Sequence, residues 1–128
     1  MPNVLLIYDD RSAKLTVEGV LASLNITPVH MILDEFAAEF LLAEMFDLII
    51  FELFTENRSC ITILKQLEKL VTTSGIDHPP VIVVTDQGLG ITEQALRTAK
   101  VSFFFIKPLA EAELTAAIQQ SLQPPTTP

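Results

Sequence analysis

The feature of this sequence that most restricts its fold is a set of short apolar segments, several of which are apolar at nearly every position. These segments are rich in Val, Ile and Phe, and they lie at residues 4–8, 27–32, 48–51, 81–85 and 102–106. Strands that are buried on both faces of a parallel sheet have this composition, whereas strands with one solvated face alternate apolar and polar residues. We therefore predict that each segment is a strand of a sheet covered on both sides.

Between these segments, apolar residues recur three or four positions apart, which is the spacing of one helix face. The first stretch has Ser12 as its expected N-cap. The stripes are Ala13, Val17, Val20, Leu21 and Leu24; Phe36, Ala37, Phe40 and Leu41; Cys60, Leu64, Leu67 and Val71; Ala95, Leu96 and Ala99; and Leu114, Ile118 and Leu122. Strands that alternate with helices predict an α/β fold, a (βα)5 doubly wound parallel sheet with the flavodoxin-like strand order 2-1-3-4-5.

The length of 128 residues suits a single domain. We assign residues 1–122 to this domain and the Pro-rich residues 123–128 to a disordered tail or the start of a linker. No apolar run approaches the length of a membrane span, and the N-terminus lacks the basic region of a secretory signal. The single cysteine, Cys60, excludes an internal disulfide. Together these features favour a cytoplasmic protein without a membrane partner.

The charge balance and the loops exclude several functions. The net charge is −8, from 8 basic and 16 acidic residues, which argues against nonspecific binding of nucleic acid by this domain. No Gly-rich loop follows the first predicted strand, so nucleotide binding is not indicated. No nucleophile–histidine–acid series or histidine spacing typical of metal ligands is present, and we expect no catalytic residues and no enzyme activity.

Polar residues gather where the predicted strands end. Asp9 and Asp10 follow the first strand, Glu52 the third, Thr85 closes the fourth, and Lys107 follows the fifth. Because the carboxyl ends of parallel strands share one edge of a sheet, these side chains should converge there. An acidic cluster suits a hard cation such as Mg²⁺, and the lysine could neutralise an anion or pair with Glu52.

Residues 3–122 resemble the receiver domains of two-component response regulators, which are CheY-like domains. The resemblance rests on four segments in order, each of which corresponds to one strand of a receiver domain and the residues at its end. They are Val-Leu-Leu-Ile-Tyr-Asp-Asp at 4–10, Phe-Asp-Leu-Ile-Ile-Phe-Glu at 46–52, Pro-Val-Ile-Val-Val-Thr at 80–85, and Phe-Phe-Ile-Lys-Pro at 104–108.

The resemblance implies a role for each residue at the strand ends. In that family an aspartate after the third strand accepts a phosphoryl group, acids after the first strand hold Mg²⁺, and a Thr or Ser and a Lys bind the phosphoryl oxygens. Thr85 and Lys107 match the positions that bind the phosphoryl oxygens. Phe104 is an aromatic residue at the position of the family's switch aromatic on the fifth strand. A histidine kinase or another signalling protein is the implied partner. A homodimer through the face of the fourth helix, fifth strand and fifth helix is also implied.

The departures from the family indicate a degenerate site. Glu52 occupies the position of the phosphoacceptor aspartate, Tyr8 takes the first acid position, and Asp86 replaces a small residue. The extra methylene of glutamate, about 1.5 Å long, displaces its carboxylate from the position needed for in-line attack on a phosphorus atom. Asp9 and Asp10 are then expected to bind Mg²⁺ weakly at best, and no other cofactor is expected.

These departures leave three interpretations open. The first is a pseudo-receiver that is not phosphorylated and acts through protein contacts. The second is a receiver phosphorylated on Glu52 or an adjacent acid with Mg²⁺, and the third is an unrelated flavodoxin-like enzyme or ligand-binding domain. The first predicts a salt link between Glu52 and Lys107 that holds one state, against the alternative that Lys107 points into solvent.

Overall fold

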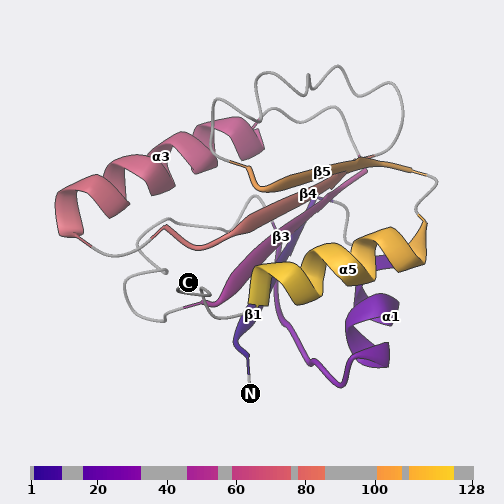
Figure 1. Ribbon diagram of the computed structural model, residues 1–128. Coiled ribbons are helices and arrows are strands. Elements are labelled where there is room, and N and C mark those ends of the chain that lie inside the picture. The colour runs from indigo at the N-terminus through magenta and orange to yellow at the C-terminus, as the bar shows by residue number, and fades with distance from the viewer. Residues whose placement is uncertain are drawn as a thin grey trace.

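The protein folds around a parallel sheet of five strands in the order β2-β1-β3-β4-β5. The computed structural model describes residues 2–9, 16–32, 46–54, 59–75, 78–85, 101–107 and 110–122. The strands are β1 (Val4–Tyr8), β2 (Val29–Ile32), β3 (Leu48–Leu53), β4 (Val81–Thr85) and β5 (Phe103–Ile106). The predicted fold class and strand order are therefore confirmed (Figure 1).

The strand boundaries differ from the predicted ones at three places. The second strand begins at Val29 rather than residue 27, and the fifth begins at Phe103 rather than residue 102. The third strand continues beyond residue 51 to Leu53, because Leu53 is paired with Thr85 of β4 in the parallel ladder. Glu52 consequently lies inside the strand, in register with Tyr8 of β1, and not in the loop that follows.

Three helices of the described segments cover the two faces of the sheet. Helix α3 (Ser59–Ser74) lies on one side, and α1 (Thr16–Ser23) and α5 (Glu111–Leu122) lie together on the other (Figure 1). The predicted stripes around Phe36 and Ala95, the N-cap Ser12 and the tail at 123–128 lie outside the described residues.

The ends of α1 and α3 follow from backbone chemistry. Helix α1 ends at Ser23, one residue before the predicted stripe does, because Asn25 adopts a left-handed conformation with φ 61°. The N–H of Ile26 then donates to the carbonyl of Leu21 at 2.9 Å, which satisfies an end of the helix that would otherwise lack a partner. Gly75, with φ 72°, ends α3 in the same way.

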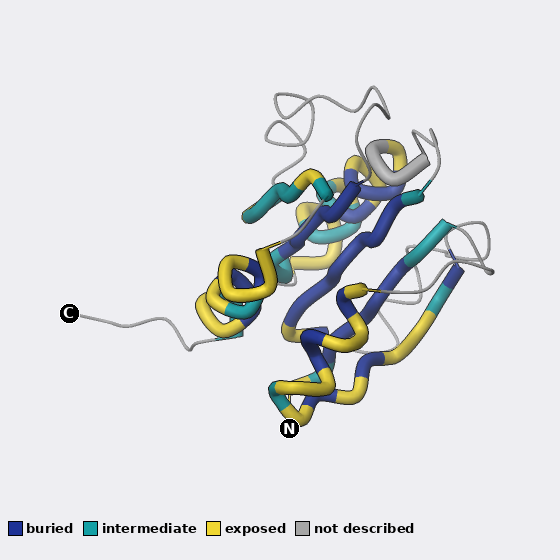
Figure 2. Tube along the Cα trace, turned by 90° about the vertical axis from the view of Figure 1, so that its right-hand side faces the viewer, coloured by how far each residue is buried: buried dark blue, intermediate teal, exposed yellow. Residues whose placement is uncertain are grey.

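The core consists of two apolar clusters, one on each face of the sheet. On the α3 side, Phe51 of β3 packs with Leu64 and Leu67 of α3, and on the other side Ile50 of β3 packs with Leu21 of α1 and Ile118 of α5. Successive residues of a strand point to opposite faces, so the central strands are buried throughout their length, as Figure 2 shows. Among the described residues, no helix is both long and apolar enough to cross a membrane.

Candidate functional site

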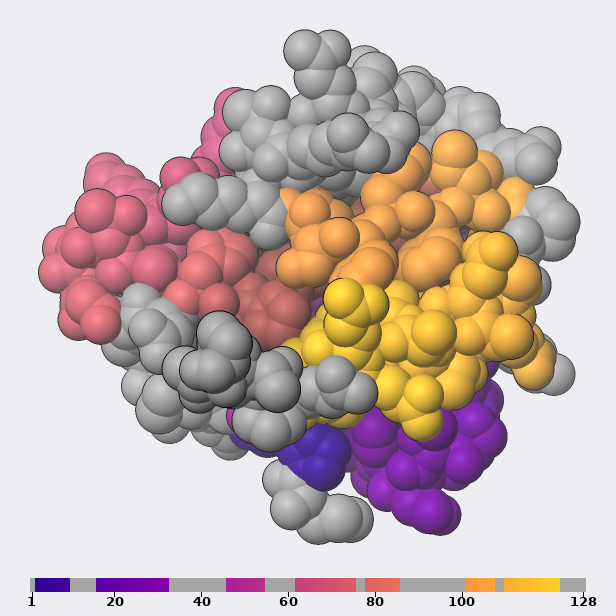
Figure 3. Space-filling view, viewed as in Figure 1, coloured from indigo at the N-terminus to yellow at the C-terminus, as the bar shows by residue number. Residues whose placement is uncertain are grey.

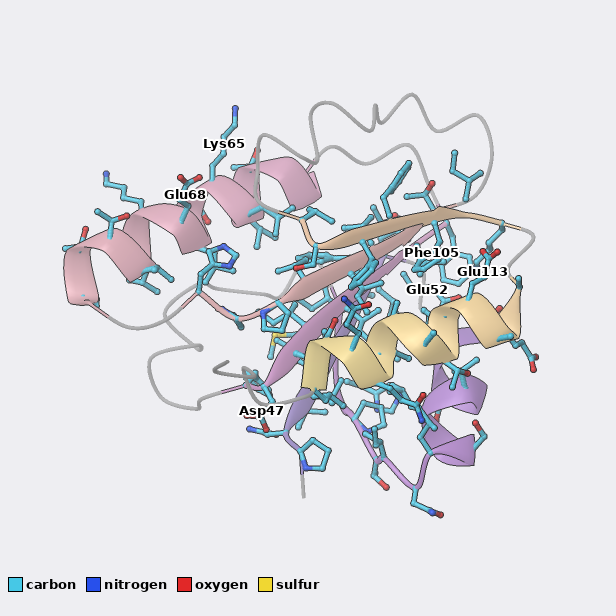
Figure 4. The ribbon with its side chains drawn as sticks, viewed as in Figure 1. Asp47, Glu52, Lys65, Glu68, Phe105 and Glu113 are labelled. Atoms are coloured by element: carbon cyan, nitrogen blue, oxygen red, sulfur yellow. The ribbon has the colours of Figure 1, made fainter. Side chains whose placement is uncertain are left out.

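Among the described residues, Glu52 is the only charged one that is buried, and it lies near the carboxyl edge of the sheet. Its neighbours Phe51 and Leu53 belong to the cluster on the α3 side, whereas Ile50 belongs to the cluster on the α1 and α5 side. Alternation along the strand therefore directs Glu52 toward α1 and α5 (Figure 4). The side chain has no solvent exposure, so its charge needs compensation from the protein.

The compensation comes from two elements that are distant in the sequence. Oε2 of Glu52 accepts a hydrogen bond from the backbone N–H of Thr16 at 3.0 Å, and Oε1 accepts one from the N–H of Val17 at 3.1 Å. Oε2 also lies 2.9 Å from Nζ of Lys107. We call this arrangement the Glu52 clamp: the Glu52 carboxylate, the N–H groups of Thr16 and Val17, and the Lys107 ammonium.

Lys107 is held on more than one side. Its Nζ lies 3.8 Å from the centroid of the Phe54 ring, a distance that suits a cation–π interaction. Its backbone N–H donates to the carbonyl of Thr85 at 2.9 Å, and its side chain is only 18% exposed. The predicted salt link with Glu52 is thus confirmed, and the alternative of a lysine that points into solvent is wrong. The reason is that Glu52 is long enough, and buried enough, to draw the ammonium inward.

Asp9 is directed toward the segment after β3. Its Oδ1 accepts a hydrogen bond from the N–H of Phe54 at 2.7 Å. Asp10 and Asp86 lie outside the described residues. Within the described segments, no group of three His, Cys, Asp or Glu side chains could hold a metal ion. Since the carboxylates of Asp9 and Glu52 are engaged with backbone N–H groups, the described part of the site does not fit a Mg²⁺ ion, which requires several oxygen ligands in octahedral geometry.

Thr85 and Phe104 lie on the opposite face of the sheet from Glu52. Thr85 is buried and is two residues beyond Val83, which belongs to the α3-side cluster. Phe104 is partly buried and packs against that same cluster. Two of the positions that match receiver residues, Thr85 and Phe104, therefore occupy the α3 side, whereas the third, Lys107, belongs to the Glu52 clamp on the other side.

Three contributors to the site were not foreseen from the sequence. The N–H groups of Thr16 and Val17 are backbone donors, and no side-chain pattern marks them. Phe54 contributes both a ring under Lys107 and an N–H bonded to Asp9. The sequence could have indicated Phe54 as a site residue only because it is an aromatic directly after the third strand. An aromatic residue at a strand end usually packs in the core.

Comparisons of the sequence with models of protein families and with curated proteins give no match. Comparison of the fold with solved structures gives many. A response regulator protein from Burkholderia multivorans has 19% identity and a TM-score of 0.63, with 99% of this chain and 100% of the other covered. The receiver domain of a signal transduction histidine kinase from Syntrophus aciditrophicus has 18% identity and a TM-score of 0.71, with coverages of 95% and 90%.

A further similar structure is the BeF3-activated N-terminal receiver domain of RstA from Klebsiella pneumoniae. It has 17% identity and a TM-score of 0.69, with 95% of this chain and 99% of the other covered. At these identities the likeness establishes the fold, and nearly the whole of this chain takes part in it. The chain therefore has the fold of a CheY-like response regulator receiver domain.

Proposed function

We propose that this chain is a signal-transduction receiver module that is not phosphorylated and acts through contacts with other proteins. The receiver fold over nearly the whole chain supports the signalling role. The observation that carries the absence of phosphorylation is the state of Glu52, whose carboxylate is fully buried with both oxygens already accepting hydrogen bonds. We class the chain as a binding module and not as an enzyme.

The chemistry of phosphoryl transfer explains why the state of Glu52 matters. A carboxylate that attacks phosphorus must present a free oxygen in line with the leaving group. Attack by Oε2 would require the bonds to Thr16 and Lys107 to break, and attack by Oε1 would require loss of the bond to Val17. The ammonium that would bind the phosphoryl oxygens is instead paired with Glu52 itself. The clamp therefore opposes both halves of the reaction.

In the Glu52–Lys107 pair, the carboxylate provides part of the negative charge that a phosphoryl group would bring to the lysine. It places a negative charge beside the lysine without any modification, although a carboxylate has less charge and fewer acceptor oxygens than a phosphoryl group. Such a domain would present one conformation to its partner at all times. We propose that the partner is a histidine kinase or another signalling protein.

Incubation with a small phosphodonor tests this function. The chain should keep its intact mass after treatment with acetyl phosphate or phosphoramidate in the presence of Mg²⁺. The Glu52→Asp variant should also gain little labelling, because Tyr8 and Asp86 remain. A stoichiometric adduct mapped to Glu52 of the wild-type chain would overturn the proposal.

A further inference from the structure

The first turn of helix α1 is anchored by a residue of strand β3. The first N–H groups of any helix lack partners within the helix, and they are usually satisfied by the side chain just before it. Here Thr16 and Val17 donate instead to Glu52, which lies 36 and 35 residues further along the chain. A buried carboxylate at this end of a helix also interacts favourably with the helix dipole.

The two carboxylate oxygens of Glu52 have different hydrogen-bond partners. Oε1 accepts from Val17, whereas Oε2 is shared between Thr16 and the Lys107 ammonium. A single carboxylate thus joins three segments: the start of α1, the end of β3 and the residue after β5. An aspartate would set its carboxylate about 1.5 Å nearer to the β3 backbone, too far from α1 to keep these bonds without movement of the helix.

We propose that the Glu52 clamp is a conformational device that couples the first turn of α1 to Lys107, so that the two segments open together. The inference goes beyond the proposed function, because the coupling is a property of the unmodified chain and holds whether or not the domain signals. Its consequence is that Lys107 acts on α1 through Glu52. Removal of the lysine charge leaves the buried carboxylate under-compensated, and the first turn of α1 loosens with it.

Amide hydrogen exchange of the full chain, followed by NMR, tests the coupling. In the wild-type protein the amides of Thr16 and Val17 should exchange more slowly than the exposed first-turn amides of Glu111 and Ala112 in α5. In Lys107→Met, exchange at Thr16 and Val17 should be about tenfold faster, the change expected for loss of one hydrogen bond to a charged group. Lys65→Met, which removes an exposed lysine of α3, is the matched control and should leave both amides unchanged.

Glu52→Gln provides a second, independent readout. A glutamine has one acceptor oxygen and one donor NH₂ group. It can therefore accept a hydrogen bond from one of the two backbone N–H groups, but it places its own N–H donors against the other. We expect exchange to become faster at only one of Thr16 and Val17. The proposal is overturned if wild-type Thr16 and Val17 exchange as fast as Glu111 and Ala112, or if Lys107→Met leaves them protected. A phosphoryl adduct on Glu52 would instead contradict the proposed function, and the exchange rates would still decide the coupling.

Discussion

Nζ of Lys107 lies 2.9 Å from Oε2 of Glu52, although strand β4 separates β3 from β5 in the sheet. Two strand spacings amount to about 9.6 Å, so the bond can form only because both side chains are long. The backbone N–H of Lys107 donates to the carbonyl of Thr85, which holds Lys107 at the end of β4. The glutamate at this position therefore has a structural consequence that a shorter acid would lack.

Loss of either partner of this pair should destabilise the domain. Lys107→Met should lower the free energy of unfolding by about 3 kcal/mol, near the lower end of the range for breaking a buried ion pair, since water reaches part of the lysine. Glu52→Gln should also be destabilising, and the double variant should lose less than the sum of the two. Urea denaturation measures all four proteins, and the coupling should be about 1–2 kcal/mol. Strictly additive losses would show that the pair contributes no interaction energy.

Mg²⁺ should have little effect on this domain. The described acids at the site already accept backbone hydrogen bonds, Asp9 from Phe54 and Glu52 from α1. Mg²⁺ loses its water reluctantly and would have to displace these donors. Amide chemical shifts of Tyr8, Phe54 and Thr85 should therefore show no saturable change up to millimolar Mg²⁺. Saturation in the micromolar range would contradict this account, and Ca²⁺ serves as the comparison ion.

The surface around β5 should carry the contacts with partners. Ile106 is 52% exposed, an unusual position for a large apolar residue at the end of a strand. Phe103 and Phe105 of the same strand stack on each other with ring centroids 6.5 Å apart and planes inclined by 12°. In the space-filling view, β5 and α5 form one continuous surface (Figure 3). Apolar side chains at such a place are typical of protein interfaces.

Ile106→Glu should therefore weaken self-association or partner binding without unfolding the domain. Light scattering after size-exclusion chromatography and a thermal melt measure the two effects separately. Lys65→Glu on α3 is the control, because it adds the same side chain at an exposed position of another element. Equal effects of the two substitutions would show that the β5 surface has no special role.

Much of the fold could be predicted because the sheet leaves a strong pattern. Segments such as residues 81–85 are apolar throughout, and Val81–Thr85 is indeed a strand buried at every position. The strand order followed from the alternation of strands and helices. The wrong predictions concern the ends of elements, because the last residue of a helix or strand depends on single hydrogen bonds and dihedral angles. The left-handed Asn25 ends α1 before Leu24, and the pairing of Leu53 with Thr85 lengthens β3.

The candidate site could be predicted only in part. The convergence of Glu52 and Lys107 follows from parallel strands that share an edge, and the structure confirms it. The cap on α1 could not be foreseen, because backbone N–H groups leave no trace in a sequence and their positions depend on how α1 docks on the sheet. The roles of Thr85 and Phe104 remain predictions drawn from the resemblance to receiver domains.

A phosphoryl mimic tests whether the Glu52 clamp holds the domain in a single state that is closed to phosphoryl chemistry. Beryllium fluoride with Mg²⁺ should leave the amide spectrum of this chain unchanged, including the signals of Phe104 and Lys107, because both oxygens of the buried Glu52 carboxylate already accept hydrogen bonds. Saturable shifts at Thr85, Phe104 and Lys107 that Mg²⁺ and fluoride without beryllium do not produce would show that the site still accepts a phosphoryl group.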